Sequence, residues 1–215
     1  MAHPPFNPLD KSNLGASVSE ALLARPVGPL PPPERFIGAG IYAIYYFGAL
    51  EFYERISDRN RDNRFSQPIY VGKAVPPGAR KGGFGLGTMP GMALYDRLRE
   101  HSRSIEQARN LELGDFACRY LISDDIWIPL GEALTIEKFK PIWNVLLDGF
   151  GNHAPGGGRQ QQVKSRWDTT HPGRGWAEQL PPNPQTTAEL AQLLNDFLGG
   201  RDVPIIPTDI AVTED

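Results

Sequence analysis

Residues 37–47 read IGAGIYAIYYF, and this apolar run, rich in Ile, Tyr and Phe, decides the fold. Such a composition favours a buried β-strand. Residues 68–74, PIYVGKA, predict a second strand, and we expect the two to pair as an antiparallel hairpin. Residues 49–67 between them are charged and carry turn residues, which indicates an inserted loop or a short helix.

Further along the chain, the pattern predicts helices at 92–109, 128–139 and 186–198 and a third strand at 115–123. A long glycine-rich loop is expected at 75–90. The order strand, strand, helix, strand, helix predicts an α+β fold. We expect a small three-stranded mixed or antiparallel sheet flanked by helices, with long loop insertions and extensions at both ends.

The length of 215 residues suits one compact domain with extensions. Residues 1–35 hold eight prolines and are expected to form an extended arm, with a short helix possible at 17–24. We expect the core at 36–150 and a C-terminal extension, packed on the core, at 151–215.

Cysteine and hydropathy exclude several classes of protein. Cys118 is the only cysteine, so the chain forms no internal disulfide, and with only four histidines it lacks the usual ligands of a structural zinc site. The longest apolar run is too short to span a bilayer, and the N-terminus lacks the pattern of a secretory signal. The expected location is the cytoplasm, with no membrane partner.

The charge is segregated along the chain, although the net charge is only −3. Residues 73–109 hold seven basic and three acidic residues, and residues 156–176 hold four basic and one acidic. Residues 110–150 hold three basic and seven acidic residues. A uniformly basic coat is excluded, but the two positive segments can form one local basic face. Ordinary fluctuation explains the same pattern equally well.

Two tripeptides on the paired strands carry the strongest motif signal. Gly40-Ile41-Tyr42 and Tyr70-Val71-Gly72 bring two tyrosines and two glycines to one sheet edge. Glycine lets a backbone or a ligand approach closely. The glycine-rich stretch 83–87, by contrast, does not fit the dinucleotide pattern and no P-loop lysine follows it, which argues against a nucleotide site.

Four more candidate residues follow along the chain. Arg97 and His101 are four apart and share a helix face. Glu132 and Asn144 are twelve apart, with Pro141 between them. Together with the tripeptides, this set resembles the GIY-YIG nuclease superfamily over roughly residues 38–147. The long spacing from Tyr42 to Tyr70 and the flanking stretches 33–46 and 143–159 are similar to the type II restriction endonuclease branch, including relatives that cut CCGCGG.

The resemblance implies metal-assisted hydrolysis of a DNA phosphodiester, with one role for each motif residue. Tyr42 would be the general base, its pKa lowered by Lys73, Arg97 and the metal ion. Tyr70 would orient water or phosphate. Arg97 would also hold the scissile phosphate. His101 would hydrogen-bond the phosphate or the base. Each residue also has a plainer interpretation, as a packed strand tyrosine or a surface side chain.

Glu132 is the implied ligand of one Mg²⁺, with Mn²⁺ as a substitute, because phosphate oxygens and water can complete the shell. Glu137 is a rival on the same helix, but its spacing to Asn144 is wrong. Asn144 is expected to brace the site or to contact phosphate.

A second set of residues is expected to bind DNA outside the reaction centre. His153 lies in a C-terminal loop among basic residues, with Trp167 and Trp176 nearby in sequence, and packing is an equal alternative for all three. The remaining candidates are Arg80, Lys81, Arg159 and Arg166.

The sequence therefore predicts a Mg²⁺-dependent, site-specific endonuclease for double-stranded DNA. A palindromic target with one active site per chain implies a homodimer, with residues 49–67 or the N-terminal arm supplying the contact. A cognate DNA methyltransferase is implied as a system partner without direct contact. The alternatives are a structure-specific or repair-type nickase of the same fold and a non-catalytic DNA-binding module.

Overall fold

The computed structural model describes residue 7 and residues 10–76, 89–153 and 162–206. Four strands lie in these ranges: β1 (Gly28–Pro29), β2 (Gly40–Tyr46), β3 (Tyr70–Ala74) and β4 (Phe116–Ile122). The α-helices are α1 (Lys11–Leu23), α2 (Glu54–Asn60), α3 (Ala93–Gln107), α4 (Ile128–Phe139), α5 (Ile142–Val145), α6 (Arg166–Thr170) and α7 (Thr187–Leu198). Short 3₁₀ turns are η1 (Glu51–Tyr53), η3 (Leu113–Asp115), η4 (Asp125–Trp127) and η5 (Ala177–Gln179).

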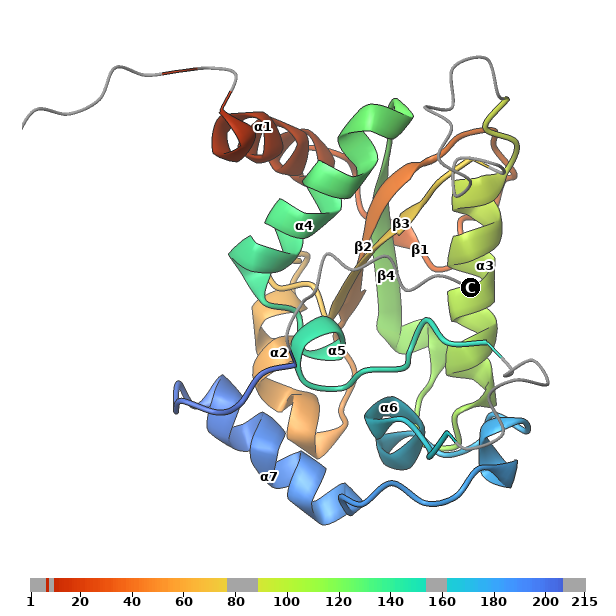
Figure 1. The fold of residues 1–215 in the computed structure, drawn as a ribbon, viewed down its shortest axis with the longest axis vertical. Helices are drawn as coiled ribbons and strands as arrows, with labels where there is room; N and C mark the ends of the chain where they lie inside the picture. Colours follow the sequence, from red (N-terminus) through yellow and green to blue (C-terminus); the bar gives the residue numbers. More distant parts are fainter. Residues whose placement is uncertain (1–6, 8–9, 77–88, 154–161, 207–215) are drawn as a thin grey trace, which may run out of the picture.

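The strands form one antiparallel sheet in the order β1-β4-β2-β3 (Figure 1). β2 is paired on both sides and is buried along its whole length, which accounts for its continuous apolar sequence. The predicted α+β fold and the antiparallel β2–β3 pair are confirmed. The prediction of three strands is wrong by one, because β1 adds a two-residue strand beside β4.

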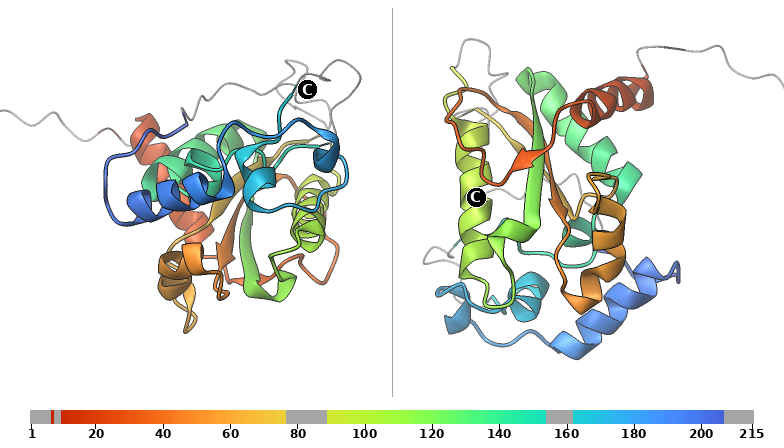
Figure 2. Two further views of the ribbon diagram at one scale, coloured as in Figure 1. Left: turned by 90° about the horizontal axis from the view of Figure 1, so that it is seen from below. Right: turned by 180° about the vertical axis from the view of Figure 1, so that it is seen from behind.

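The two faces of the sheet build two hydrophobic clusters, since side chains alternate along a strand. One cluster holds Ile41, Ala43 and Tyr45, together with residues of α1 and α4. The other holds Tyr42 and its same-face neighbours on β2, together with residues of α3, α5, α6 and α7. Figures 1 and 2 show α3 on one side of the sheet and α1 with α4 on the other. The site described below lies where Tyr42 points toward α3.

The N-terminal region is more structured than predicted. α1 includes most of the short helix expected at 17–24 but begins earlier, and it lies beside α4 with Leu22 fully buried, while β1 joins the sheet, so the described part is not an extended arm. The Arg119 side chain of β4 donates to the Leu23 carbonyl at the end of α1. Proline enrichment misled the prediction because the described prolines of this region, from Pro26 on, all follow the helix and do not interrupt it.

The segment between β2 and β3 packs on the chain's own core. Its η1 turn buries Tyr53 completely, in a chain of hydrogen bonds. Trp143 Nε1 donates to the Tyr53 hydroxyl (2.7 Å), which leaves that hydroxyl to donate to His171 Nε2 (2.6 Å). His171 Nδ1 then donates to the Asn110 side-chain oxygen (3.0 Å). The network joins the insertion to the C-terminal extension and fixes a neutral histidine.

This buried histidine makes stability depend on pH. Burial lowers the pKa of His171 to about 3 from an ordinary value near 6.5. Between these values the unfolded chain binds a proton at His171 and the folded chain does not. The free energy of unfolding should therefore fall as pH drops below about 6.5, by roughly 1.4 kcal/mol per pH unit for this residue. Burial also lowers the pKa of His101, which adds an effect of the same sign.

Urea unfolding of the wild-type protein and of His171→Gln at several pH values between 5 and 8 measures the effect. The variant should be less stable at pH 7.5 and should lose stability less steeply below pH 6.5. Parallel curves for the two proteins would contradict the assignment.

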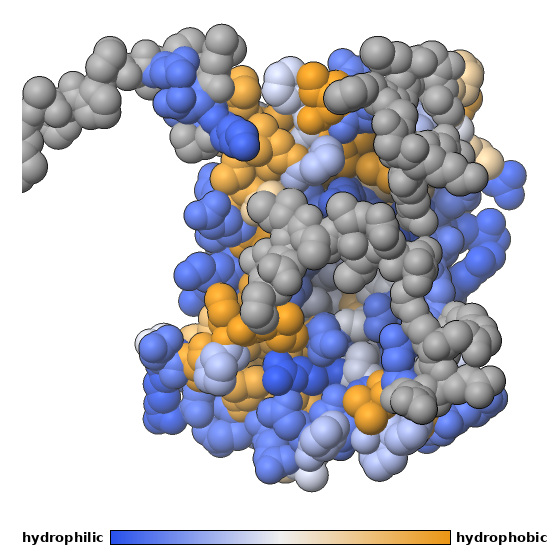
Figure 3. All heavy atoms as spheres, in the orientation of Figure 1, coloured by the Kyte–Doolittle hydropathy of each residue, from blue (hydrophilic) through white to orange (hydrophobic). Residues whose placement is uncertain are grey.

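The helix ends follow local sequence signals. Thr186 and Glu189 form a capping box at the start of α7. α4 ends at Phe139, before Pro141, with Lys140 in the left-handed conformation. In the described ranges, no helix is both long and apolar enough to span a bilayer. In the view of Figure 3, hydrophobic residues gather over α1 and α4, whereas the α3 side is largely hydrophilic.

Candidate active site

Tyr42 and His101 form the centre of the candidate site. The Tyr42 hydroxyl lies 2.5 Å from His101 Nε2, in a hydrogen bond between β2 and α3. The β-ladder places Tyr42 opposite Gly72. A Cβ atom at Gly72 would lie 2.4 Å from the Tyr42 hydroxyl, so only glycine leaves room for the phenol. The two sequence tripeptides therefore act together: one supplies the phenol, and the other supplies the space beside it.

The burial of the site holds these groups in their neutral forms. Burial, together with Tyr70 and Glu132, raises the pKa of Tyr42 well above 10, and Arg97 opposes this. Burial also raises the pKa of Tyr70 to about 12. For His101, burial and the neighbouring Arg97 lower the pKa well below 6.5. At neutral pH the site therefore contains two protonated phenols and an uncharged imidazole.

Burial opposes the lowering of the Tyr42 pKa that the sequence predicts. A lowered value was expected from Lys73 and Arg97 in the presence of a metal ion. In the structure, the Lys73 ammonium pairs with Glu132 (2.7 Å). Arg97 lowers the pKa of Tyr42, but by less than burial raises it. The low dielectric of a fully buried position outweighs a single cation nearby.

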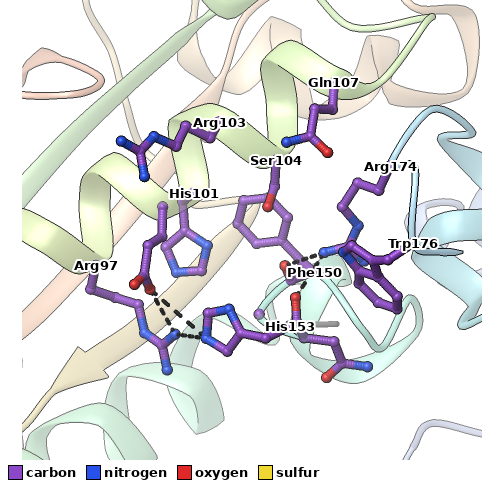
Figure 4. Close-up of a pocket in the computed structure, with 12 residues that line it drawn as sticks. Arg97, His101, Arg103, Ser104, Gln107, Phe150, His153, Arg174 and Trp176 are labelled. Atoms are coloured by element: carbon purple, nitrogen blue, oxygen red, sulfur yellow. Dashed lines mark hydrogen bonds and ion pairs between the residues drawn. The ribbon is translucent and has the colours of Figure 1, made fainter. Parts of the chain in front are cut away.

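Arg97 lies one helical turn before His101 on α3. Its Nη1 donates to His153 Nε2 (2.8 Å) and to a Glu100 carboxylate oxygen (3.2 Å). The Arg97 side chain is 25% exposed. A pocket of about 180 Å³ opens beside it, and His101, Arg103, Gln107 and Trp176 are among its lining residues (Figure 4). Arg97 thus carries a positive charge close enough to Tyr42 to act on it electrostatically.

Glu132 approaches the site from α4. Burial raises the pKa of its carboxyl, and Lys73 and Arg97 oppose this rise. The side chain remains 18% exposed. In the ranges that the structure describes, no three carboxylate, histidine or cysteine side chains gather into a metal cage. A lone, partly buried carboxylate fits a Mg²⁺ ion that takes its other ligands from water and substrate phosphate.

Asn144 braces the sheet with both ends of its side-chain amide. Its Oδ1 accepts from the Val71 backbone N–H (2.9 Å), and its Nδ2 donates to the Val71 carbonyl (2.8 Å). Val71 lies between Tyr70 and Gly72 in the second tripeptide. Asn144 therefore fixes the backbone of β3 beside these two residues. Of its two expected roles, these contacts favour bracing the site.

The predicted DNA-binding residues divide into two groups. His153 lies at the site through its bond to Arg97. Arg166 Nη1 donates to the Leu146 carbonyl (3.1 Å), and no described contact joins it to the site. Arg80, Lys81 and Arg159 lie outside the described residues, so their DNA-binding role stays a prediction.

The sequence interpretation missed Phe150, Asp168 and Arg174. Phe150 stacks on His101, and the fully buried Arg174 holds the backbone beside it. A glycine-rich stretch gave no sign of a buried ring, and Arg174 counted only as part of a basic segment. Trp167, by contrast, is completely buried, so packing is its role in the folded chain.

Comparison with protein families matches residues 34–198 to the Eco29kI GIY-YIG domain. This is a type II restriction endonuclease family, and the match covers more than half of the chain. It spans all six motif positions, from Tyr42 on β2 to Asn144 on α5. No curated protein matches the chain. The chain therefore belongs to the Eco29kI GIY-YIG domain family of restriction endonucleases, and it is a DNA phosphodiester hydrolase.

Proposed function

We propose that the protein is a type II restriction endonuclease that makes site-specific double-strand breaks in DNA by metal-dependent hydrolysis. The observation that supports this most directly is the hydrogen bond of Tyr42 to His101, with Arg97 and Glu132 close enough to act on Tyr42 electrostatically. One buried proton donor and acceptor, one cation and one carboxylate are the groups that phosphodiester hydrolysis requires.

Tyr42 acts as the general base by passing its own proton to His101. At neutral pH an uncharged imidazole can accept the hydroxyl proton across the 2.5 Å contact. The ordinary pKa values of tyrosine and histidine differ by about 3.5 units, so this transfer costs at least about 5 kcal/mol in the free protein. The positive charge of a metal ion bound together with the substrate would have to offset that cost. The reaction is therefore expected to start only after DNA is bound.

The charged groups divide the remaining work. Arg97 holds the scissile phosphate through its forked guanidinium. Tyr70, protonated at neutral pH, donates its hydroxyl to water or to a phosphate oxygen. Lys73 pairs with Glu132 and favours its ionised form, against the effect of burial. Glu132 would hold a Mg²⁺ ion, with Mn²⁺ as a substitute. The bound ion would supply positive charge that stabilises the negative charge developing on the phosphate oxygens.

A palindromic target, GC-rich and similar to CCGCGG, suits a homodimer because each protomer then cuts one strand. In a cell such an enzyme works in the cytoplasm beside a DNA methyltransferase that protects the same sequence. Sedimentation of the protein with and without target DNA tests the assembly. A strictly monomeric protein that still breaks both strands at one site would contradict it.

The direct test is cleavage of plasmid and phage DNA containing CCGCGG sites, with Mg²⁺, Mn²⁺ or chelator. The wild-type protein should give discrete fragments only with metal. Glu132→Gln should cut about 100- to 1,000-fold more slowly, because an amide binds the cation weakly. Glu137→Gln, an exposed glutamate on the same helix, is the matched control and should cut normally. Absence of cleavage by the wild type on all these DNAs would contradict the proposal.

A further inference from the structure

Phe150 covers the face of the His101 ring. Their ring centroids are 4.5 Å apart and the planes meet at only 16°. Phe150 also packs edge-on against Tyr70, at 5.0 Å and 79°. Phe150 and His101 are almost completely buried. One phenyl ring thus restricts both the imidazole and the second tyrosine of the site.

The backbone that follows Phe150 stays at the site. A Cβ atom at Gly151 would lie 3.3 Å from the Tyr70 hydroxyl, so the main chain passes close to that phenol. Two residues later, His153 accepts a hydrogen bond from Arg97. Residues 149–153 therefore touch three of the proposed catalytic side chains: His101, Tyr70 and Arg97.

Arg174 holds this loop in one conformation. Its guanidinium donates to the carbonyls of Gly149 (2.7 Å), Phe150 (3.1 Å) and Asn152 (3.1 Å). Two further hydrogen bonds, of 2.7 and 2.8 Å, pair it with Asp168. All five N–H groups of an arginine can be used in this way.

Two tryptophans stack on the same guanidinium. Its carbon lies 4.6 Å from the ring centre of Trp167 and 4.8 Å from that of Trp176. Figure 4 shows Arg174 and Trp176 beside Phe150, on the side of the pocket away from Arg97. The five hydrogen bonds use the N–H groups of this arginine, and the two tryptophans cover its faces. Binding phosphate is therefore not its role.

We propose that Arg174 and Phe150 are positioning residues for DNA cleavage: Arg174 fixes the loop, and Phe150 then holds the His101 ring with Nε2 toward the Tyr42 hydroxyl. The inference rests on the proposed function of Tyr42 and His101. A stacked ring limits rotation of the imidazole and keeps water from its face. Without it, His101 would present Nε2 to Tyr42 for only part of the time.

Phe150→Leu tests the proposal, with Phe116→Leu as the matched control. Phe116 is equally buried and contacts Tyr46 and Trp143, but no described contact joins it to His101. Single-turnover cleavage should slow roughly 10- to 100-fold in Phe150→Leu, as expected for a misplaced catalytic group. DNA binding in chelator should stay within about three-fold of wild type, since no phosphate ligand is lost. Phe116→Leu should cleave at the wild-type rate at temperatures where it is folded.

A second readout does not depend on activity. The groups that face His101 are Tyr42 from β2, Tyr70 from β3, Arg97 from α3, and His153 and Arg174 from the loops. An NMR titration of the imidazole should show its pKa rising toward 6.5 by about one unit or more in Phe150→Leu, because water gains access to the ring. The same titration should be unchanged in Phe116→Leu.

The link between Arg174 and Phe150 is tested by Arg174→Lys, which keeps the charge and loses the fork. If Arg174 acts through Phe150, the double variant Arg174→Lys with Phe150→Leu should cleave little more slowly than the slower of the two single variants. Additive losses would overturn the link. Should Arg174→Lys fail to fold, the His101 titration and the cleavage rates of the two leucine variants decide the role of Phe150.

The outcomes separate this inference from the proposed function. Equal cleavage rates and equal His101 titrations in Phe150→Leu and wild type would overturn the positioning role while leaving the nuclease intact. A wild-type protein that cuts no DNA would overturn the proposed function. In that case a shifted His101 titration would still support the contact, but not its catalytic purpose.

Discussion

Tyr42→Phe is expected to lower the single-turnover rate of DNA cleavage by roughly 10³- to 10⁴-fold, within the range for loss of a general base. The substitution removes one oxygen atom and keeps the ring that packs in the core. It leaves His101 Nε2 without its 2.5 Å partner and deprives the attacking water of a proton acceptor. Rates measured under saturating enzyme, with cleavage-site mapping on a defined fragment, quantify the loss.

Tyr46→Phe is the matched control for this experiment. Tyr46 lies four residues further along β2 on the same face and is equally buried, and its hydroxyl accepts a hydrogen bond from the Leu50 backbone (3.0 Å). Its loss should cost some stability and leave the cleavage rate within about three-fold of wild type, because no reacting group changes. Equal activity of Tyr42→Phe and Tyr46→Phe would refute the role of Tyr42.

Arg174→Met is expected to reduce the free energy of unfolding by about 3–5 kcal/mol, as for other buried ion pairs that lose one partner. Both side chains of the Arg174–Asp168 pair are only 2% exposed, so the variant leaves a buried carboxylate without its cation. Three loop carbonyls lose their donor as well. Since native stability is usually 5–15 kcal/mol, this single change removes a large part of it.

Chemical denaturation of Arg174→Met beside Arg201→Met provides the comparison. Arg201 also pairs with an aspartate, Asp196, but its side chain is 72% exposed. Water screens such a pair, and its loss should cost less than about 1 kcal/mol. A double variant, Arg174→Met with Asp168→Asn, should recover part of the stability by removing the unpaired charge. Similar losses for the two methionine variants would argue against a buried, charge-paired anchor.

The elements near the nuclease motifs could be predicted because each has a strong local signal. α4 occupies the predicted residues 128–139, and β2, β3 and β4 lie within their predicted segments. The full extent of α1, beyond the short helix expected at 17–24, could not be predicted in the same way, because this helix packs against α4, a distant element. Proline content describes local backbone freedom and carries no information about such a partner.

The site shows the same limit in chemical terms. The motif pattern predicted that Tyr42, Arg97, His101 and Glu132 lie near one another, as they do in the structure. The effect of nearby cations on the Tyr42 pKa could be expected from sequence, but the opposing effect of burial could not, because burial is a property of the assembled core. Lys73 follows the second tripeptide in sequence, yet its ammonium pairs across to α4. The position of Lys73 next to the second tripeptide does not reveal that its charge pairs with the Glu132 carboxylate.

The contacts of α5 with β3 have a consequence for how molecules of this protein can associate. β3 ends the sheet on one side, and its outward backbone groups would otherwise be open to strand addition. The Trp143 backbone N–H donates to the Ile69 carbonyl (3.0 Å), and the Asn144 amide takes both backbone groups of Val71. Asn144 therefore stands in for a neighbouring strand. It protects this part of the edge from pairing with a strand of another chain.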